Sequence, residues 1–127
     1  MALGELGKTY EDGEIIIQQG DEGNCMYVIQ EGQVEVILEN EGQEIKVGVR
    51  DKGEFIGEMA IFDRDVRSAT IRSLGQSRVL TVDKKNFLRR VHEDPSLAFR
   101  LVEIMSKRIR ELGEEITRLQ QDKPGNV

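Results

Sequence analysis

A glycine, a glutamate, an arginine and a serine lie close together near the middle of this 127-residue chain. Gly57 permits an unusual backbone conformation and the close approach of a ligand. Residues 58–61 are long enough for one helical turn, whose free N–H groups would favour an anion. Arg67 can hold a phosphate with a forked pair of charge-assisted hydrogen bonds, and Glu58 can accept a hydrogen bond from a ribose hydroxyl. Together these residues predict a pocket for a ribose phosphate. The alternative is a surface ion pair between Glu58 and Arg67 that closes a loop without a ligand.

The composition excludes several other kinds of site. The chain has 24 acidic and 18 basic residues, a net charge of -6, one cysteine and one histidine. An acidic chain lacks the clustered Lys and Arg of a nucleic-acid surface. A single cysteine forms no internal disulfide, and one histidine with one cysteine makes no zinc site. With no apolar run long enough for a membrane span and no signal peptide, we expect a cytoplasmic, soluble protein without a metal, a nucleic-acid partner or a membrane.

The residue types also argue against an enzyme. No Ser/His/Asp, Cys/His or paired-carboxylate arrangement is visible. A metal enzyme of the cupin type would have a similar β pattern, but it needs several histidines and the chain has one. We therefore expect a protein that is not an enzyme.

The elements that must position these residues belong to two parts of the chain, an expected β part up to Val82 and an expected helical part after it. From about residue 8 to residue 82, glycine and acidic turns separate short segments that are rich in β-branched residues. These expected strands are Ile15–Ile17, Met26–Gln30, Val34–Leu38, Ile45–Val49, Ser68–Ser73 and Arg78–Val82. Val34, Val36 and Leu38 alternate with Glu35 and Ile37, as in a half-buried strand. Glu41-Gly42 predicts a hairpin turn, and the whole pattern favours a sandwich, barrel or jelly roll.

After Val82 the period becomes helical. Asp83 can cap a helix over Lys84–His92, and Asp94-Pro95 can start a second helix that runs to about Gln121. Gly113 would weaken this helix internally, and residues 122–127 resemble a frayed tail.

The second helix has apolar residues at alternating spacings of three and four, typical of a coiled-coil seam. They are Val102, Met105, Ile109, Leu112, Ile116 and Leu119. The seam predicts either a homodimer through the C-terminal helix or a face that docks on the barrel.

The motif around Gly57 also resembles a known family. The run Gly53-x-Phe55-x-Gly57-Glu58-Met59-Ala60, followed by Arg67-Ser68-Ala69, resembles the phosphate-binding cassette of cyclic nucleotide-binding domains. The stretch from Gly13 to Val36 is similar to the first strands of that domain. The resemblance covers residues 10–119 and is closest to bacterial catabolite-activator-type regulators.

The resemblance implies a mainly β fold with C-terminal α structure, namely a double-stranded β-helix (jelly-roll-like) barrel followed by a long C-terminal helix. It implies a single domain over 1–127, with the barrel at about 8–82, a short cassette helix near 58–61 and C-terminal helices at about 83–121.

The resemblance also implies roles for cassette residues. Glu58 would accept a hydrogen bond from the ribose 2′-OH, Arg67 would pair with the cyclic phosphate, and Ser68 would add a hydroxyl contact. Backbone groups around the sugar-phosphate would come from Gly57, Met59 and Ala60.

Two departures from the family pattern affect the cassette and the base. Val66 replaces the proline that often precedes the arginine. Leu112-Gly113 replaces the Thr-Ser pair that contacts adenine in the nearest activators, so Leu112 could serve as an apolar lid over the base. Thr117 is the nearest remaining hydroxyl on that helix.

The resemblance therefore implies a sensor that binds cyclic AMP, with cyclic GMP as the other candidate ligand, and that relays binding through the C-terminal helix to an unknown effector. The alternative is a ligand-independent dimerisation or adaptor module with a degenerate pocket.

Overall fold

The computed structural model describes residues 7–62 and 66–121. Contacts within the chain define two compact units, Met1–Leu88 and Arg89–Val127, and each is described by itself. The predicted tail at 122–127 lies outside the described residues, and the prediction of one domain over the whole chain stays a prediction.

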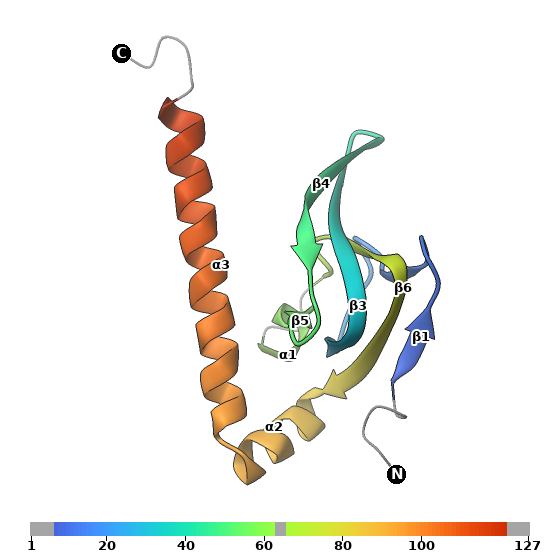
Figure 1. Ribbon diagram of the computed structural model, residues 1–127, viewed down its shortest axis with the longest axis vertical. Coiled ribbons are helices and arrows are strands. Elements are labelled where there is room, and N and C mark those ends of the chain that lie inside the picture. The colour runs from blue at the N-terminus through green and yellow to red at the C-terminus, as the bar shows by residue number, and fades with distance from the viewer. Residues whose placement is uncertain (1–6, 63–65, 122–127) are drawn as a thin grey trace. The chain divides into compact units, whose positions relative to one another are not determined.

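The first unit is a curled, mostly antiparallel sheet (Figure 1). Its elements are β1 (Lys8–Tyr10), β2 (Ile15–Ile17), β3 (Cys25–Asn40), β4 (Gln43–Arg50), β5 (Phe55–Ile56), α1 (Met59–Phe62) and β6 (Thr70–Asp83). The hydrogen-bonded order is β1-β6-β3-β4, while β2 pairs with β6 and β5 pairs with β3. Among the described residues this path ends at β1 and β4, so the sheet is not closed. The predicted mainly β class is confirmed.

Strand β3 is longer than the sequence predicts. The expected strands at Met26–Gln30 and Val34–Leu38 form one strand, in which the pairing with β6 shifts register on both sides of Glu31. Gly32, with φ of 79°, produces the irregularity, and a Cβ there would lie 2.4 Å from the Gln76 carbonyl oxygen. The glycine therefore bends the strand and does not end it.

Strand β6 likewise joins most of the expected strands at Ser68–Ser73 and Arg78–Val82, but it begins at Thr70, so Ser68 precedes it. Gly75 inside the strand has φ of 71°. The sequence prediction missed β1 and β5, which have three and two residues. The equally short β2 was predicted because it consists of three isoleucines.

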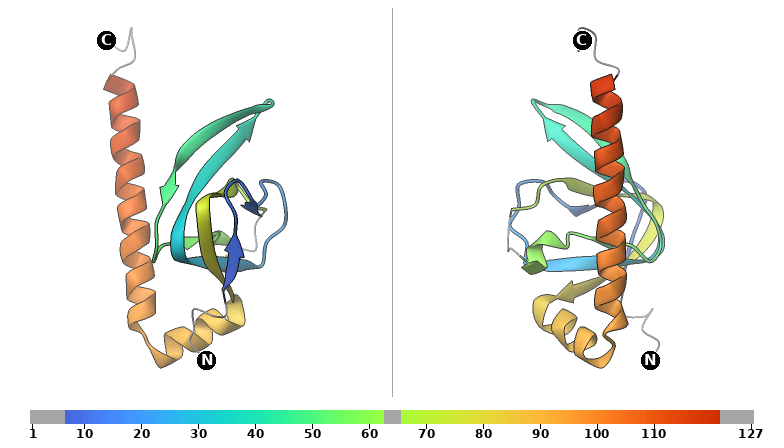
Figure 2. Two further views of the ribbon diagram at one scale, coloured as in Figure 1. Left: turned by 45° about the vertical axis from the view of Figure 1, so that its right-hand side comes forward. Right: turned by 90° about the vertical axis from the view of Figure 1, so that its left-hand side faces the viewer.

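The β3–β4 hairpin confirms the turn predicted at Glu41-Gly42. Their φ angles are 53° and 80°, the left-handed values that a two-residue hairpin turn of type I′ requires. Asn40 pairs with Gln43 beside this turn, and the hairpin extends beyond the other strands of its unit (Figure 2).

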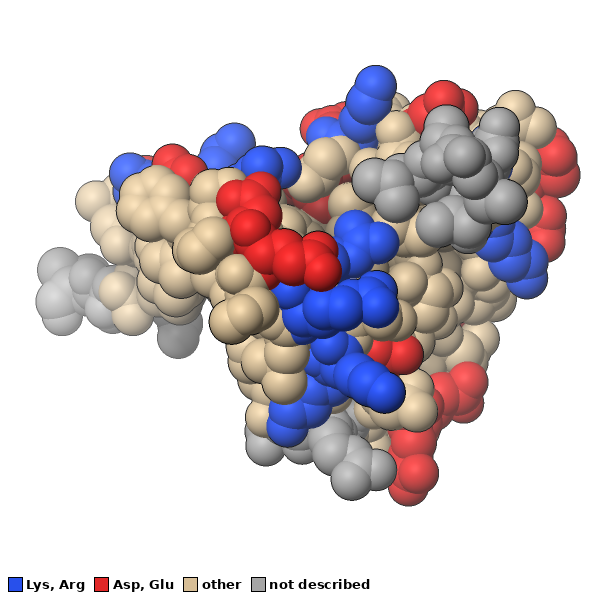
Figure 3. Space-filling view, turned by 90° about the horizontal axis from the view of Figure 1, so that it is seen from below, with Lys and Arg blue, Asp and Glu red and all other residues tan. Residues whose placement is uncertain are grey.

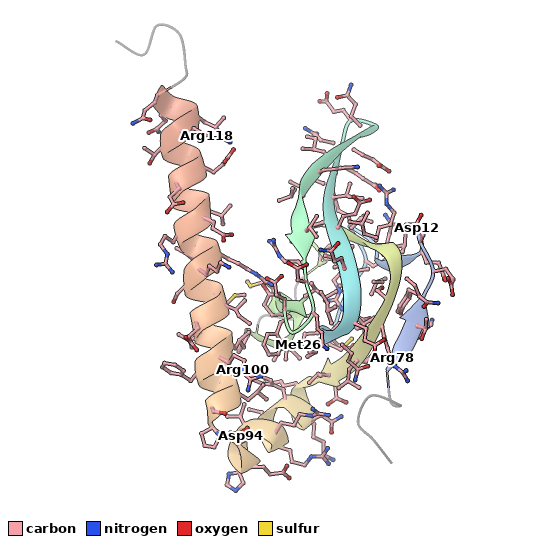
Figure 4. The ribbon with its side chains drawn as sticks, in the orientation of Figure 1. Asp12, Met26, Arg78, Asp94, Arg100 and Arg118 are labelled. Atoms are coloured by element: carbon pink, nitrogen blue, oxygen red, sulfur yellow. The ribbon has the colours of Figure 1, made fainter. Side chains whose placement is uncertain are left out.

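The core of the first unit lies inside the curl of the sheet. It consists of Tyr10, Ile17, Ile29, Val34, Ile56, Ile71 and Val79. Met26 is also buried and lies among the strands, whereas Asp12 lies at the turn that follows β1 (Figure 4). The Asp12 carboxylate accepts a hydrogen bond from the Gly75 N–H at 2.7 Å and so ties this turn to β6.

The burial of Glu35 contradicts the simple alternation expected for β3. Glu35 is only 7% exposed, whereas Leu38, expected on the inner face, is 39% exposed. Arg72 compensates the buried carboxylate, because its Nε and Nη2 lie 2.9 and 2.8 Å from Glu35 Oε1. Glu44 accepts further hydrogen bonds from the same guanidinium. The hydrogen bond to Glu35, followed by those to Glu44, raises the pKa of Arg72.

Helix α2 (Lys84–Glu93) leads from the first unit into the second, where α3 (Ser96–Gln121) follows. The expected caps are confirmed: Asp83 Oδ1 accepts from the Asn86 N–H at 2.7 Å, and Asp94 Oδ1 accepts from the Ser96 N–H at 3.1 Å. The helix continues through Gly113 without a break. No helix in the described ranges is long and apolar enough to cross a membrane.

Helix α2 also carries basic residues in an otherwise acidic chain. They are Lys84, Lys85, Arg89 and Arg90. Lys and Arg side chains gather on the face drawn in Figure 3. The net charge of -6 thus hides a local basic segment, and the expected absence of a nucleic-acid partner stays a prediction.

Candidate phosphate site at the β5–α1 turn

The chain brings Gly57 and Arg67 into direct contact. Gly57 lies between β5 and α1 with φ of 71°, a conformation that L side chains rarely adopt. The Arg67 Nη1 donates a hydrogen bond to the Gly57 carbonyl oxygen at 3.1 Å. A Cβ on Gly57 would lie 2.6 Å from this Nη1 and 3.0 Å from Ile17 Cδ1, so the close approach depends on glycine.

The rest of the Arg67 guanidinium faces the start of β3. Its Nη2 donates to the Cys25 carbonyl oxygen at 2.8 Å and lies 3.8 Å from Cys25 Sγ. Its Cζ lies 5.8 Å from the centre of the Tyr27 ring, within range of a cation–π interaction. The Arg67 guanidinium is therefore held by two neutral carbonyl oxygens, the sulfur of Cys25 and one aromatic ring.

The loop between β2 and β3 fixes the backbone of Arg67. The Arg67 N–H donates to the Asp21 carbonyl oxygen at 2.7 Å, and the Gly20 N–H donates to the Arg67 carbonyl oxygen at 2.9 Å. Gly23 lies against the guanidinium, since a Cβ there would be 2.2 Å from Arg67 Nε. Both the backbone and the side chain of Arg67 thus depend on this loop.

The other cassette residues occupy the same turn. Glu58 is half-buried directly after Gly57, and Met59 and Ala60 begin α1, with Met59 exposed and Ala60 buried. The Ala60 N–H donates to the Gly57 carbonyl oxygen at 3.3 Å, so this amide already has a partner within the turn. Ser68 is exposed and directly follows Arg67.

Tyr27 has an environment that disfavours its ionisation. Burial raises its pKa to about 12, with further increases from its hydrogen bond to Cys25 and the interaction with that thiol, while the positive charge of Arg67 acts in the opposite direction. Tyr27 therefore presents a neutral ring to Arg67 across the physiological pH range.

The two candidate base contacts belong to the second unit. Leu112 is 59% exposed on α3, and the Thr117 hydroxyl donates to the Gly113 carbonyl oxygen at 3.0 Å. Their role as a lid over the base stays a prediction.

Sequence reasoning missed five contributors to the site: the carbonyl groups of Cys25 and Asp21, the amide of Gly20, the close approach at Gly23 and the ring of Tyr27. Cys25 is half-buried, and its carbonyl oxygen faces Arg67. A signal for the loop was present in the glycines of Gly20-Asp21-Glu22-Gly23, which permit a close approach. A backbone carbonyl has no signal in the residue types.

Comparisons with known proteins identify similar domains. The family model described as "Cyclic nucleotide-binding domain" matches residues 7–94. A putative potassium channel protein of Rhodopseudomonas palustris is 34% identical over 116 residues, which are 89% of this chain and 27% of the relative. A cAMP-dependent protein kinase regulatory subunit of Schizosaccharomyces pombe is 36% identical over 81 residues, which are 64% of this chain and 19% of the relative.

Among solved structures, the catabolite activator protein of Thermus thermophilus superposes with a TM-score of 0.76 at 27% identity, over 91% of this chain and 56% of that one. The chain therefore spans between about a fifth and about half of the length of these relatives.

Proposed function

The chain belongs to the cyclic nucleotide-binding domain family, and from this premise we propose that it is a regulatory module that binds cyclic AMP at the turn between β5 and α1. The observation that carries the proposal is the Arg67 guanidinium, which lies at the Gly57 turn, where its Nη1 donates to the Gly57 carbonyl oxygen and its Nη2 donates to the Cys25 carbonyl oxygen. A cyclic phosphate would offer this guanidinium charged acceptors, which bind about twice as strongly as neutral ones.

The remaining cassette residues complete the proposed pocket. Glu58 accepts the ribose 2′-OH, Ser68 adds a hydroxyl contact to the phosphate, and backbone groups of Gly57, Met59 and Ala60 line the sugar-phosphate. The likeness of these residues to the family's cassette supports the assignment, and the name of the cAMP-dependent protein kinase regulatory subunit favours cyclic AMP over cyclic GMP.

Calorimetric titration of the purified chain with cyclic AMP and cyclic GMP tests the proposal. We expect Arg67→Ala to weaken binding by ~2–5 kcal/mol, because it leaves the bound phosphate without its partner. Arg78→Ala, which removes an arginine at another place in the sheet, is the matched control and should leave the affinity unchanged. No heat and no thermal shift at millimolar nucleotide would contradict the proposal.

The role of Glu58 has its own test. A 2′-deoxy analogue of cyclic AMP should bind much more weakly than cyclic AMP to the wild-type chain, because Glu58 would lose its hydroxyl donor. In Glu58→Ala the preference for the ribose form should disappear. Equal affinities of both nucleotides for the wild-type chain would show that Glu58 does not contact this hydroxyl.

We further propose that the module is not an enzyme, that it acts in the cytoplasm on an unknown effector and that binding is relayed through α3. Leu112 would cover the base, with Thr117 as the nearest hydroxyl. Binding can shift α3 only as far as the nucleotide prefers one of its arrangements. Hydrogen exchange over residues 89–121 with and without cyclic AMP measures that shift.

A ligand-independent dimerisation or adaptor module is the second candidate. It is favoured by the exposed apolar seam of α3 and by the fact that Arg67 already has partners within the chain. Light scattering with and without cyclic AMP separates the two functions, because the adaptor would form the same dimer at any nucleotide concentration.

A further inference from the structure

Gln19 makes an unusual connection between the loop after β2 and the end of β3. Its Nε2 donates to the Glu39 carbonyl oxygen at 3.1 Å, and its Oε1 accepts from the Glu39 N–H at 2.8 Å. The side-chain amide therefore satisfies both backbone groups of Glu39, as a neighbouring strand would do.

This connection begins where the regular sheet stops. The last residue of β3 that pairs with β6 is Ile37, opposite Thr70, and Glu39 lies two residues further along the same strand. Backbone groups on an uncovered strand edge need partners. The side-chain amide of Gln19 provides these partners. It thereby adds one pair of hydrogen bonds beyond the last residue pair between β3 and β6.

The backbone of Gln19 is anchored in the same region. The Gln19 N–H donates to Thr70 Oγ1 at 3.0 Å, and Gln18 Nε2 donates to the same oxygen at 3.4 Å. Thr70 is buried at the start of β6. Gln19 is thus held from both sides, by Glu39 through its side chain and by Thr70 through its backbone.

The next two residues of this loop hold Arg67. Gly20 and Asp21 exchange backbone hydrogen bonds with Arg67 at 2.9 and 2.7 Å. Gly20 has φ of 93°, so one of the two residues that hold Arg67 is a glycine, whose backbone is less restricted than that of other residues. Without the side-chain hydrogen bonds of Gln19, the backbone groups of Gly20 and Asp21 that hold Arg67 would be free to shift.

We propose that Gln19 is a positioning residue that sets the place of Arg67 and couples it to the tip of the β3–β4 hairpin. The inference rests on the proposed role of Arg67 in phosphate binding. It predicts that a ligand on Arg67 stiffens the hairpin at Glu39, and that loss of the Gln19 side-chain bonds loosens the hold on the ligand.

A double-mutant cycle distinguishes this role from a simple contribution to stability. Gln19→Met keeps the length of the side chain and removes both hydrogen bonds to Glu39. Its matched control is Gln76→Met, because Gln76 Nε2 also makes an exposed long-range hydrogen bond, to Glu11 at 3.1 Å, away from the loop that holds Arg67. Each change is made in the wild-type chain and in Arg67→Lys, which retains a positive charge.

We expect Gln19→Met to weaken cyclic AMP binding by about three- to tenfold in the wild-type chain, the scale of lost hydrogen bonds, and by less than about twofold in Arg67→Lys. Gln76→Met should change the affinity in neither background. An equal loss in both backgrounds would overturn the proposal, because Gln19 would then act independently of Arg67.

Amide hydrogen exchange in the ligand-free chain tests the positioning without any nucleotide. Gln19→Met should accelerate exchange at the Glu39, Gly20 and Arg67 amides and leave Gly13 and Ser73 unchanged, since those two amides pair with other backbone groups. Unchanged exchange at Gly20 and Arg67 would overturn the inference. If the exchange changes but the wild-type chain binds no cyclic nucleotide, the proposed function fails while the positioning of Arg67 by Gln19 stands.

Discussion

At the scale of single residues, Gly57 and Arg67 depend on each other. The positive φ of Gly57 turns its carbonyl oxygen toward the Arg67 guanidinium, and the absence of a side chain leaves room for Nη1. The positive φ limits which residues the backbone tolerates, whereas the missing side chain determines how closely Arg67 can approach. A comparison of Gly57 with a second glycine of positive φ separates these two effects.

Gly57→Ala should destabilise the fold by ~1–2 kcal/mol, the cost of a left-handed conformation for an L residue, and should also weaken cyclic AMP binding. Gly75→Ala is the matched control, because Gly75 has the same φ of 71° but a Cβ there would meet nothing within 4 Å. It should show a similar loss in denaturant unfolding and unchanged calorimetric affinity. Equal affinities of the two variants would show that the space beside Gly57 is irrelevant to the ligand.

At the scale of elements, the start of α3 depends on one carboxylate. The hydroxyl and the backbone N–H of Ser96 both donate to Asp94 Oδ1, at 2.6 and 3.1 Å. The hydroxyl bond contributes most, followed by the N–H and the charge of Arg100, and they lower the pKa of Asp94 below its usual value of 3.8. The stabilisation is therefore present above about this pH and is lost as the carboxylate becomes protonated in acid.

Asp94→Ala should lower the thermal midpoint of α3 at pH 7, because the Ser96 N–H loses its acceptor. The difference from the wild-type chain should shrink as the pH falls below 3.8 and through the lowered pKa of Asp94, because the wild-type carboxylate is then protonated as well. Circular dichroism melts at pH 7 and at pH 3 measure this. Asp94→Asn keeps an acceptor oxygen and should show little change, and a gap that grows in acid would contradict the assignment.

The elements that the sequence predicted well are those defined by local signals. The left-handed turn at Glu41-Gly42 and the caps at Asp83 and Asp94 follow from the chemistry of adjacent residues, and all three are confirmed. The continuity of β3 through Gly32 could not be predicted, because it depends on pairing with β6 across the sheet. The burial of Glu35 likewise depends on Arg72, which comes from another strand.

The candidate site shows the same division. The motif around Gly57 and Arg67 could be recognised from residue types, and the structure brings these two residues together. The groups that surround Arg67 could not be recognised from residue types, because they are carbonyl and amide groups of Cys25, Asp21 and Gly20. Backbone groups are the same in every residue, so only the fold determines which of them face the guanidinium.

At the scale of the whole molecule, the proposed homodimer depends on the exposed apolar seam of α3. Its members include Val102, Ile109, Leu112, Ile116 and Leu119, which are each more than half exposed. Their spacing of three and four residues places them on one side of a helix, as in a coiled coil. We expect two copies of the chain to pair through these residues.

Ile109→Glu should weaken the proposed homodimer by at least about tenfold, because it places a charge in an apolar seam. Lys107→Glu, on the other side of the helix, adds the same residue and should leave the dimer intact. Sedimentation velocity over a range of concentrations measures both. A wild-type chain that sediments as a monomer at all concentrations would contradict the proposed pairing.

The place of Tyr27 has an optical consequence for the whole chain. The chain has no tryptophan and two tyrosines, so its ultraviolet emission comes from Tyr10 and Tyr27 alone. Lys8 lies over the ring of Tyr10 and Arg67 lies over the ring of Tyr27, at 4.9 and 5.8 Å. We therefore expect that movement of Arg67 toward a phosphate bound at the proposed site would change the quenching of Tyr27. The total tyrosine emission would then report binding without a dye or an added label.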